Sequence, residues 1–562
     1  MPRREIAPGR SCLECRRRRI KCDRSRPCSY CVKVRIECKY PTSRSVLDED
    51  QGALSRIAVL ELRLATVEKR LSDIDGPRPG APSSATASLA QHQNGEALAQ
   101  ERDERFVGMD ISRTHSPSLA PPSHTPSNDS LRSAIVNPQP PVELASFRPS
   151  GPTIALLWQR YLEVVDPLLK VFHTPTVQGL VIRAIATRGR DPLDMASECL
   201  LFVIYYATIA AMSPENCLSE FDEERIVLLK RYRLAVENLL SRLNTLASFD
   251  LMVLQAFTIY LIMGRCDEEG SDAYGPIGLA AGMALNMGLN RDGEAAGLPP
   301  FEVEMRRRLW WQLCILDIRV AEDRHSEPCI LESSFNTRLP SNVSDVNLHP
   351  EMSRVPIAEN GRTEMLYSLV RFEGSYFARQ LVFSKTFSEE NGYMQMSVAQ
   401  KCHAIDLFQE RIEKQYLVHC DDQIPFDRVI VESIRLVLAK LRLSVQVPEK
   451  EQLHGTQETQ IKAWVNFLKD AENLRAYEPG KQLLWLFQTY LEWDALLNIL
   501  TCLREGSPRE EVDQAWEVSY RVYNYWKDLS IWRDHRWQRI EQLRKEVLAA
   551  RHRSAPGPAL ES

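Results

Sequence analysis

The sequence has no apolar run long enough to cross a membrane. Its longest nearly unbroken apolar segments, residues 199–212 and 251–264, have 14 residues each, whereas a membrane-spanning helix needs about 20. No apolar stretch follows the basic residues 1–10, so we expect no secretory signal. We therefore predict buried core helices at both apolar runs and no membrane partner.

Three signatures of common enzyme classes are also absent: HExxH, GxSxG and GxxxxGK[ST]. His173 could be imagined as a catalytic base, but we expect a histidine that is hydrogen-bonded at a helix end. Trp310 and Trp311 are expected in the core rather than around a ligand. We predict that the chain is not an enzyme.

Charge is distributed unevenly along the 562 residues. The net charge is −5. Residues 1–45 hold fourteen Lys and Arg against four Asp and Glu, hence +10, and the remaining residues hold 56 against 71, hence −15. A basic head on an acidic body indicates that the head binds a polyanion.

Composition divides the chain into further segments. Residues 39–52 are a short polar linker. Residues 76–150 contain 11 Pro, 4 Gly and 12 Ser, too little apolar surface to offset the entropy of ordering, and we predict a disordered linker there. Residues 151–551 repeat apolar positions at intervals of three and four, which predicts one large all-α domain, followed by a tail at 552–562.

The first 38 residues contain six cysteines in two equivalent halves. These are Cys12, Cys15, Cys22, Cys28, Cys31 and Cys38, and the second half repeats the first at an offset of 16 residues. One structural zinc takes four ligands and would leave two cysteines idle. Two zinc ions need eight ligand positions, which six thiolates supply if two sulfurs bridge both metals. The pseudo-symmetry predicts one bridging cysteine in each half.

A disulfide scaffold is the alternative for these six cysteines. It would require an oxidising compartment and a signal peptide, and neither is indicated. A block of this length has almost no apolar core, so metal binding must drive its folding. We predict a binuclear cluster that holds two zinc ions per chain. Eight other cysteines are scattered and expected as reduced core thiols; they are Cys199, Cys217, Cys266, Cys314, Cys329, Cys402, Cys420 and Cys502.

Five cations occupy the six positions between the second and third cysteines. They are Arg16, Arg17, Arg18, Arg19 and Lys21. Such groups neutralise DNA phosphates, and guanidinium forks can donate to guanine in the major groove. We predict that this run binds double-stranded DNA. The alternative is a nuclear-import signal or a solvated face, and import can be a second role of the same residues.

The whole block resembles the fungal binuclear-cluster (Zn2Cys6) transcription factors. Besides the six cysteines, the resemblance rests on Arg16, on residues 18–23 (Arg-Arg-Ile-Lys-Cys-Asp), on Arg-Pro-Cys at 26–28 and on Tyr-Pro at 40–41.

This resemblance implies roles for individual residues. It makes Cys12 and Cys28 the bridging ligands, and it places the helix after Cys15 in the major groove at a CGG triplet. The base-reading lysine of the family falls on Arg19. Arginine can donate to the same guanine atoms, but its reach differs from that of lysine.

Residues 53–75 follow a heptad pattern. Its a and d positions are Ile57, Leu60, Leu64, Val67, Leu71 and Ile74. Its g and e positions would pair in a parallel dimer as Arg56–Glu61, Arg63–Glu68 and Arg70–Asp75, always with opposite charge. A single amphipathic helix packed on the body would explain the apolar stripe but not these pairs. We predict a parallel homodimeric coiled coil, as the family resemblance also implies.

Part of the large helical region resembles the fungal-specific transcription factor domain. The similar segments are residues 165–169 with 172–176, 275–293, 304–311 with Asp317 and Arg319, and 335–340. Three arginines, Arg306, Arg307 and Arg308, could contact DNA, but on an acidic domain we expect them to pair with acids or cap helices. Beyond about residue 420 the sequence shows only compatible helices.

The sequence therefore predicts a mainly α protein with a Zn2Cys6 cluster (12–38), a coiled coil (53–75) and a regulatory helical domain (151–551). We expect a nuclear homodimer that regulates RNA polymerase II genes with transcriptional coregulators, and the resemblance favours a secondary-metabolite gene cluster. Control of nutrient or primary metabolism stays open. So does another class: a helical ligand-binding or scaffold protein with a zinc interaction module.

Overall fold

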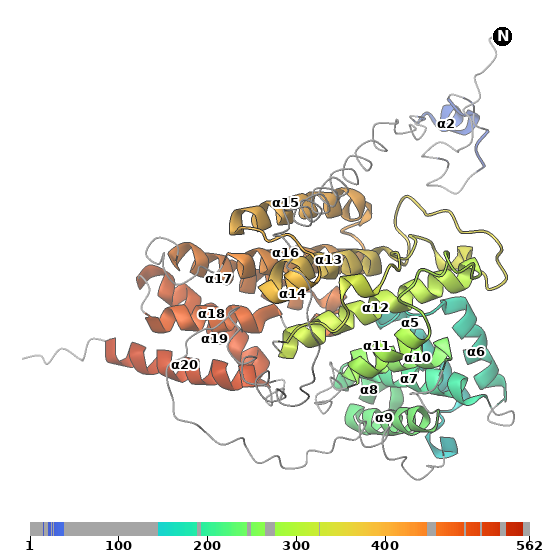
Figure 1. The fold of residues 1–562 in the computed structure, drawn as a ribbon, viewed down its shortest axis with the longest axis horizontal. Coiled ribbons are helices and arrows are strands. Elements are labelled where there is room, and N and C mark those ends of the chain that lie inside the picture. Colours follow the sequence, from blue (N-terminus) through green and yellow to red (C-terminus); the bar gives the residue numbers. More distant parts are fainter. Residues whose placement is uncertain are drawn as a thin grey trace, which may run out of the picture. The chain divides into compact units, whose positions relative to one another are not determined.

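The chain divides into two units, residues 1–101 and 102–562, in a computed structural model (Figure 1). The structure describes residues 15, 21–23, 25, 27–36, 38, 144–187, 193–243, 249–264, 276–324, 326–446, 457–487, 491–505, 509–528 and 535–554. Among these residues all regular structure is helical, apart from an isolated bridge at Ser25. The predicted coil at 53–75 lies outside them. The mainly α prediction is confirmed for the part of the chain that is described.

The two apolar runs form the most buried helices of the second unit. Residues 196–211 of α7 (Met195–Ala211) are all buried, and so are residues 253–264 of α10 (Leu251–Gly264). A helix that is apolar on every side must lie in the interior, which confirms the prediction of core helices. No helix within the described ranges is long and apolar enough to cross a membrane.

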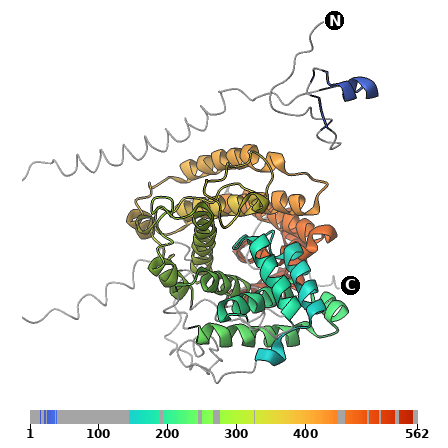
Figure 2. The same ribbon diagram turned by 90° about the vertical axis from the view of Figure 1, so that its right-hand side faces the viewer.

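One group of helices surrounds α7 and α10. It includes α5 (Gly151–Val164), α6 (Thr174–Thr187), α8 (Pro214–Phe221), α9 (Arg225–Arg242) and α11 (Ile277–Asn286). α7 packs against α5, α9 and α10, while α11 packs against α10. Figures 1 and 2 show this group in teal and green on one side of the unit.

A second group follows later in the sequence. It consists of α15 (Val398–Gln415), η4 (Leu417–His419), α16 (Pro425–Val445), α17 (Gln457–Arg475), η5 (Glu478–Leu486), α18 (Leu491–Glu505), α19 (Arg509–Asp528) and α20 (His535–Ser554). α18 packs against α17, α19 and α20, and α16 packs against α15 and α17. Figure 1 draws this group in orange and red, opposite the first.

Two helices join these groups. The long α12 (Pro300–Arg324) packs against α10, α11 and α13 (Leu366–Val382), and α13 also packs against α16. Shorter elements, η2 (Glu332–Ser334), η3 (Asp345–Asn347) and α14 (Lys385–Glu390), lie around them. Because most buried apolar side chains of both groups belong to one continuous cluster, the helical unit has a common core; Ile405, Leu441 and Val445 form a smaller separate cluster with Leu381.

The helical unit includes the last residues of the predicted 76–150 linker. The 3-10 helix η1 (Leu144–Phe147) places Leu144 in the core, where 8% of it is exposed. Arg148 forms an ion pair of 2.6 Å with the buried Glu198 of α7. Ser150 then caps α5 by accepting the backbone N–H of Thr153. The described helical unit therefore starts seven residues before Gly151.

Candidate metal centre and nucleic-acid interface

The described cysteines of the first unit converge on two overlapping groups. The sulfurs of Cys15, Cys28 and Cys31 lie within 4.8 Å of one another. The sulfurs of Cys22 and Cys28 and a carboxylate oxygen of Asp23 form a second group within the same limit. Cys28 is common to both groups, which is the position that a bridging ligand requires. Its predicted counterpart, Cys12, lies outside the described residues.

The spacing of the sulfurs suits zinc. The Sγ atoms of Cys15 and Cys28 are 3.6 Å apart, and both thiols are free of disulfide bonds. Two thiolates on one tetrahedral zinc, each about 2.3 Å from the metal, lie about 3.8 Å apart. Cys15, Cys28 and Cys31 are fully buried, so thiolates there need a positive partner. The donor set and its spacing therefore fit metal ions.

Backbone N–H groups support the sulfurs. The N–H of Cys31 donates to the sulfur of Cys28 at 3.5 Å, and the N–H of Cys28 donates to the sulfur of Cys38 at 3.3 Å. Cys28 is at the same time the N-cap of helix α2 (Ser29–Val34). These bonds orient the ligands and spread part of the thiolate charge.

Asp23 fixes the start of α2. Its carboxylate accepts the backbone N–H of Ser29 at 3.1 Å and that of Ser25 at 3.3 Å, together with both serine hydroxyls. The hydrogen bond from the Ser29 hydroxyl is the main reason why the pKa of Asp23 falls to about 2. Asp23 therefore stays ionised and ties the segment after Cys22 to the helix that carries Cys31.

The structure places the predicted DNA-binding residues only in part. Arg16, Arg17, Arg18 and Arg19 lie outside the described residues, and Lys21 is exposed. Two further exposed cations, Lys33 and Arg35, lie on the second half of the unit. Neither residue belongs to the basic run predicted to bind DNA, although the offset of 16 aligns them with Arg17 and Arg19.

The three adjacent arginines of α12 pair with acids, as predicted. Arg306 binds Glu302 at 2.8 Å, Arg307 binds Asp292 at 2.7 Å, and Arg308 binds Asp345 at 2.7 Å. Arg308 is fully buried. The contacts of Arg307 and Arg308 connect α12 to neighbouring loops, and none of the three guanidinium groups is available as an unpaired charge.

Asp345 is the centre of a buried ionic cluster. It accepts from Arg308 and from Lys170, whose Nζ lies 3.0 Å from one oxygen and 2.7 Å from Asp166. Burial alone would raise the pKa of Asp345, but the charges of Arg308 and Lys170 hold it well below its ordinary value. The cluster joins the end of α5, the start of α6 and the loop around η3.

His173 has the structural role that its position predicted. Its Nε2 lies 2.9 Å from the backbone oxygen of Asp345, and its Nδ1 lies 2.8 Å from the hydroxyl of Thr176. Because a backbone oxygen only accepts, Nε2 carries the proton. Trp310 and Trp311 are 0% and 6% exposed, which confirms their place in the core.

The scattered cysteines are mostly buried thiols. Cys199, Cys217 and Cys314 are buried, and burial raises the pKa of all three, which keeps them protonated and unreactive. Cys402, Cys420 and Cys502 are half-buried. Cys329 is exposed, so the core prediction is wrong there; its thiol donates to Asp317 at 2.9 Å. Cys266 lies outside the described residues.

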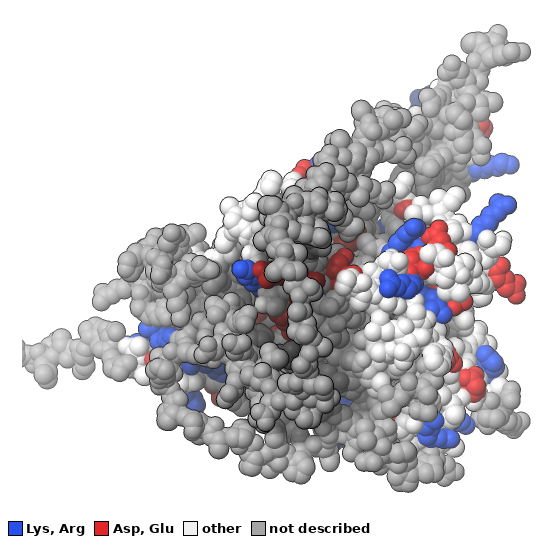
Figure 3. Space-filling view, in the orientation of Figure 1, with Lys and Arg blue, Asp and Glu red and all other residues white. Residues whose placement is uncertain are grey.

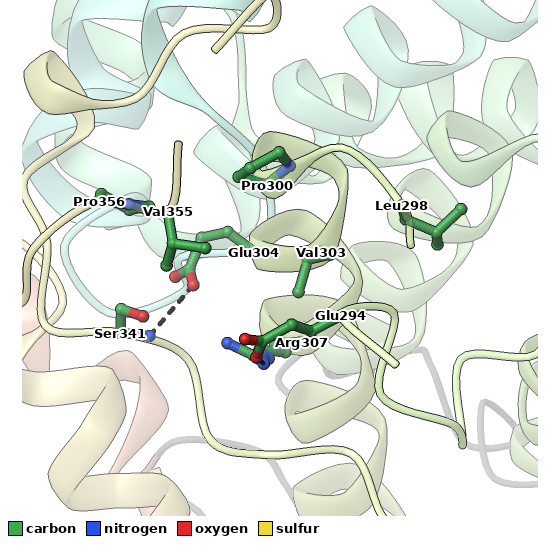
Figure 4. A pocket seen from close by; sticks show the side chains of 9 residues that line it. All are labelled: Glu294, Leu298, Pro300, Val303, Glu304, Arg307, Ser341, Val355 and Pro356. Carbon is green, nitrogen blue, oxygen red and sulfur yellow. Dashed lines mark hydrogen bonds and ion pairs between the residues drawn. The ribbon is translucent and has the colours of Figure 1, made fainter. Parts of the chain in front are cut away.

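A small pocket opens beside α12 (Figure 4). Its volume is about 60 Å³, and its lining includes Glu304, Arg307, Ser341 and Val355. Glu304 accepts the backbone N–H of Ser341 at 3.1 Å. Pockets for organic ligands measure about 300–1,000 Å³, so this pocket holds no more than a few water molecules.

Comparisons with known proteins match both units. Residues 10–46 match the fungal Zn(2)-Cys(6) binuclear cluster domain, and residues 158–414 match the fungal specific transcription factor domain. The second match ends near the position where the sequence resemblance faded.

Curated relatives extend the similarity over nearly the whole chain. The aurofusarin cluster transcription factor aurR2 of Gibberella zeae is 30% identical over 540 residues, which cover 93% of this chain and 77% of the relative. The transcriptional regulator AacuB of Aspergillus aculeatus is 26% identical over 92% of this chain and 77% of its own. The pyriculol/pyriculariol biosynthesis cluster transcription factor 1 of Pyricularia oryzae is 30% identical over 64% of this chain and 52% of its own. The chain therefore belongs to the fungal Zn(2)-Cys(6) transcription factors, whose binuclear cluster holds two zinc ions and binds DNA, and not to a family of enzymes.

Proposed function

We propose that this transcription factor is a nuclear, pathway-specific regulator of a secondary-metabolite gene cluster transcribed by RNA polymerase II. The names of two relatives carry the proposal, because each is a transcription factor of one biosynthetic cluster, for aurofusarin and for pyriculol and pyriculariol.

The six cysteines 12, 15, 22, 28, 31 and 38 are the proposed zinc ligands, with Cys12 and Cys28 as the bridges. The convergence of the described sulfurs around Cys28 supports this assignment. Within the cluster the metal ions supply the cross-links that a short segment without an apolar core needs to fold. Arg16, Arg17, Arg18, Arg19 and Lys21 would then lie beside a rigid centre and face the DNA.

The protein acts as a homodimer in this proposal. The heptad pattern of residues 53–75 supplies the contact, and residues 39–52 set the distance between two CGG-type half-sites. Residues 76–150 connect this head to the helical domain, which would receive signals from coregulators. A dimer doubles the number of phosphate contacts and therefore steepens the salt dependence of binding.

Mapping of bound sites in the native fungus tests the pathway. We expect the sites to concentrate in promoters of one contiguous set of biosynthetic genes, and those transcripts to change together when the gene for this protein is deleted. A Cys22→Ser strain is the matched control, since it keeps the helical domain but loses the cluster. Sites spread over genes of nitrogen or carbon use would contradict the secondary-metabolite assignment.

A further inference from the structure

We propose that Lys33 and Arg35, in the second half of the cysteine cluster, contact the DNA phosphate backbone. The inference rests on DNA binding by the cluster and adds a second set of contacts to the run at residues 16–21. It concerns two residues that neither the heptad pattern nor the predicted base contacts involve.

The internal repeat places these two cations at sequence positions equivalent to part of the predicted DNA-binding run. An offset of 16 residues aligns Lys33 with Arg17 and Arg35 with Arg19. In the first half every position from 16 to 19 is an arginine, whereas in the second half Val32 and Val34 alternate with the two cations. A charge is thus kept at two of the four equivalent positions.

Arg35 has a strained, left-handed backbone that the turn at the end of α2 requires, but the turn does not require its long charged side chain. Arg35 adopts φ 55° and ψ 42°, the left-handed conformation that usually takes glycine at a helix end. Its N–H donates to the carbonyl of Val32 at 3.2 Å, and the N–H of Ile36 donates to that of Cys31 at 3.1 Å. Because backbone groups alone close the helix, the turn gives no reason for a long charged side chain.

Both cations are exposed and have no acidic partner among the described residues. The described acid of the unit, Asp23, is occupied by Ser25 and Ser29. By contrast, Figure 3 shows blue and red side chains close together on the part of the helical unit that it colours. Exposed positive charges on a DNA-binding unit attract phosphates at any base sequence.

Substitution of Arg35 by glycine tests the effect of the positive charge on DNA binding without destabilising the fold. Arg35→Gly removes the cation and at the same time suits the left-handed backbone, so the full-length protein should unfold no more easily than the wild type. We expect weaker binding to cognate and scrambled duplexes alike. The slope of log K against log salt should fall by about one per chain, so that the loss of affinity between 50 and 200 mM salt shrinks about 4-fold for each chain bound. Lys33→Ala should act in the same way, and Arg35→Lys should keep the slope.

A matched control removes one positive charge from the other unit. The side chain of Lys385 is 74% exposed, and Lys385→Ala should leave the salt slope unchanged. A wild-type slope in Arg35→Gly, or an equal fall in Lys385→Ala, would overturn the inference. If Arg19→Ala keeps its site preference while Arg35→Gly lowers the slope, the proposed base reading fails and the phosphate contact stands.

Discussion

Adjacent arginines in the first half of the cysteine cluster should differ in which part of the DNA they contact, the bases or the phosphates. Successive residues on a helix point some 100° apart, so the four arginines at 16–19 cannot all face the bases. We expect Arg19→Ala to cost about 1–3 kcal/mol on the cognate duplex and to relax preference at one guanine of the CGG triplet. Arg17→Ala should instead weaken binding to every duplex and lower the salt slope by about one.

Titrations on cognate and scrambled duplexes at several salt concentrations distinguish these two effects. Arg19→Lys is the matched control, because lysine also donates to guanine O6 and N7 and should retain most of the preference. Equal losses on both duplexes in Arg19→Ala would reduce the run to an electrostatic contact without base reading.

The helical unit should lose stability in mild acid through His173. Burial lowers the pKa of His173 below its ordinary value of 6.5, against the opposing hydrogen bond to Asp345; the nearby positive charges of Arg308 and Lys170 lower it further. The unfolded chain therefore takes up a proton at a pH at which the folded chain does not. The free energy of unfolding should fall as the pH drops below about 6.5, by up to about 1.4 kcal/mol per unit of the pKa difference.

Denaturant unfolding between pH 7.5 and 5.5 measures this effect. His173→Gln should flatten the pH dependence, while substitution of the exposed His403 by glutamine should leave it as in the wild type. If the free energy of unfolding of His173→Gln depends on pH as in the wild type, other groups cause the loss of stability in acid.

Single residues mark the limit of prediction from sequence. The spacing of Cys15, Cys22 and Cys28 predicted a shared metal centre because ligand number is fixed by the metal. Asp23 was visible only as part of the family resemblance, since its role depends on a turn that brings Ser29 back to its carboxylate. The left-handed backbone at Arg35 leaves no signal in a sequence unless glycine occupies the position.

At the scale of an element, the coiled coil gives the sharpest test. Leu64 occupies a central a position of residues 53–75, and Leu64→Pro would remove a helical hydrogen bond there and kink the helix. We expect sedimentation as a monomer and a steep loss of binding to paired half-sites. A dimer that binds as before would show that the helical domain supplies the contact.

Exchange of the charges at Arg63 and Glu68 distinguishes loss of the coiled-coil contact from a general loss of helix. Arg63→Glu places like charges opposite Glu68 in a parallel dimer and should weaken dimerisation. The double variant Arg63→Glu with Glu68→Arg should restore it, since it exchanges the two signs. Failure of this rescue would contradict the parallel register even if the single variants weaken the dimer.

Elements differed in how far the sequence predicted them. α7 and α10 were evident because a 14-residue apolar run has no place except the interior. η1 was missed because a single buried residue, Leu144, anchors it within a Pro- and Ser-rich segment. The partners of α12 could not be predicted either, since the pairing of Arg308 with Asp345 joins residues 37 positions apart.

At the scale of the whole molecule, the basic head and the acidic body differ both in net charge and in what stabilises their fold. The basic first 45 residues carry +10 and the remainder −15, so phosphate attraction is concentrated in the head, while the acidic body is repelled by the same backbone. The body folds around an apolar core with internal ion pairs. The head has no such core among its described residues beyond its own cysteines. Its stability must therefore come from the metal ions, so we expect the protein to bind DNA only when zinc is bound.

Zinc removal should consequently act on one part of the chain only. Metal analysis of the full-length protein should return two zinc ions per chain, and Cys22→Ser should lower that number and abolish binding to DNA.

A chelator should have the same effect on binding, yet it should leave the far-ultraviolet circular dichroism nearly unchanged, because α2 contributes six residues to a largely helical chain. Cys199→Ser is the matched control, since this buried thiol lies in α7, and it should retain both metal ions. One zinc per chain in the wild type would end the binuclear interpretation. A large loss of helix on chelation would show that metal also supports the helical unit.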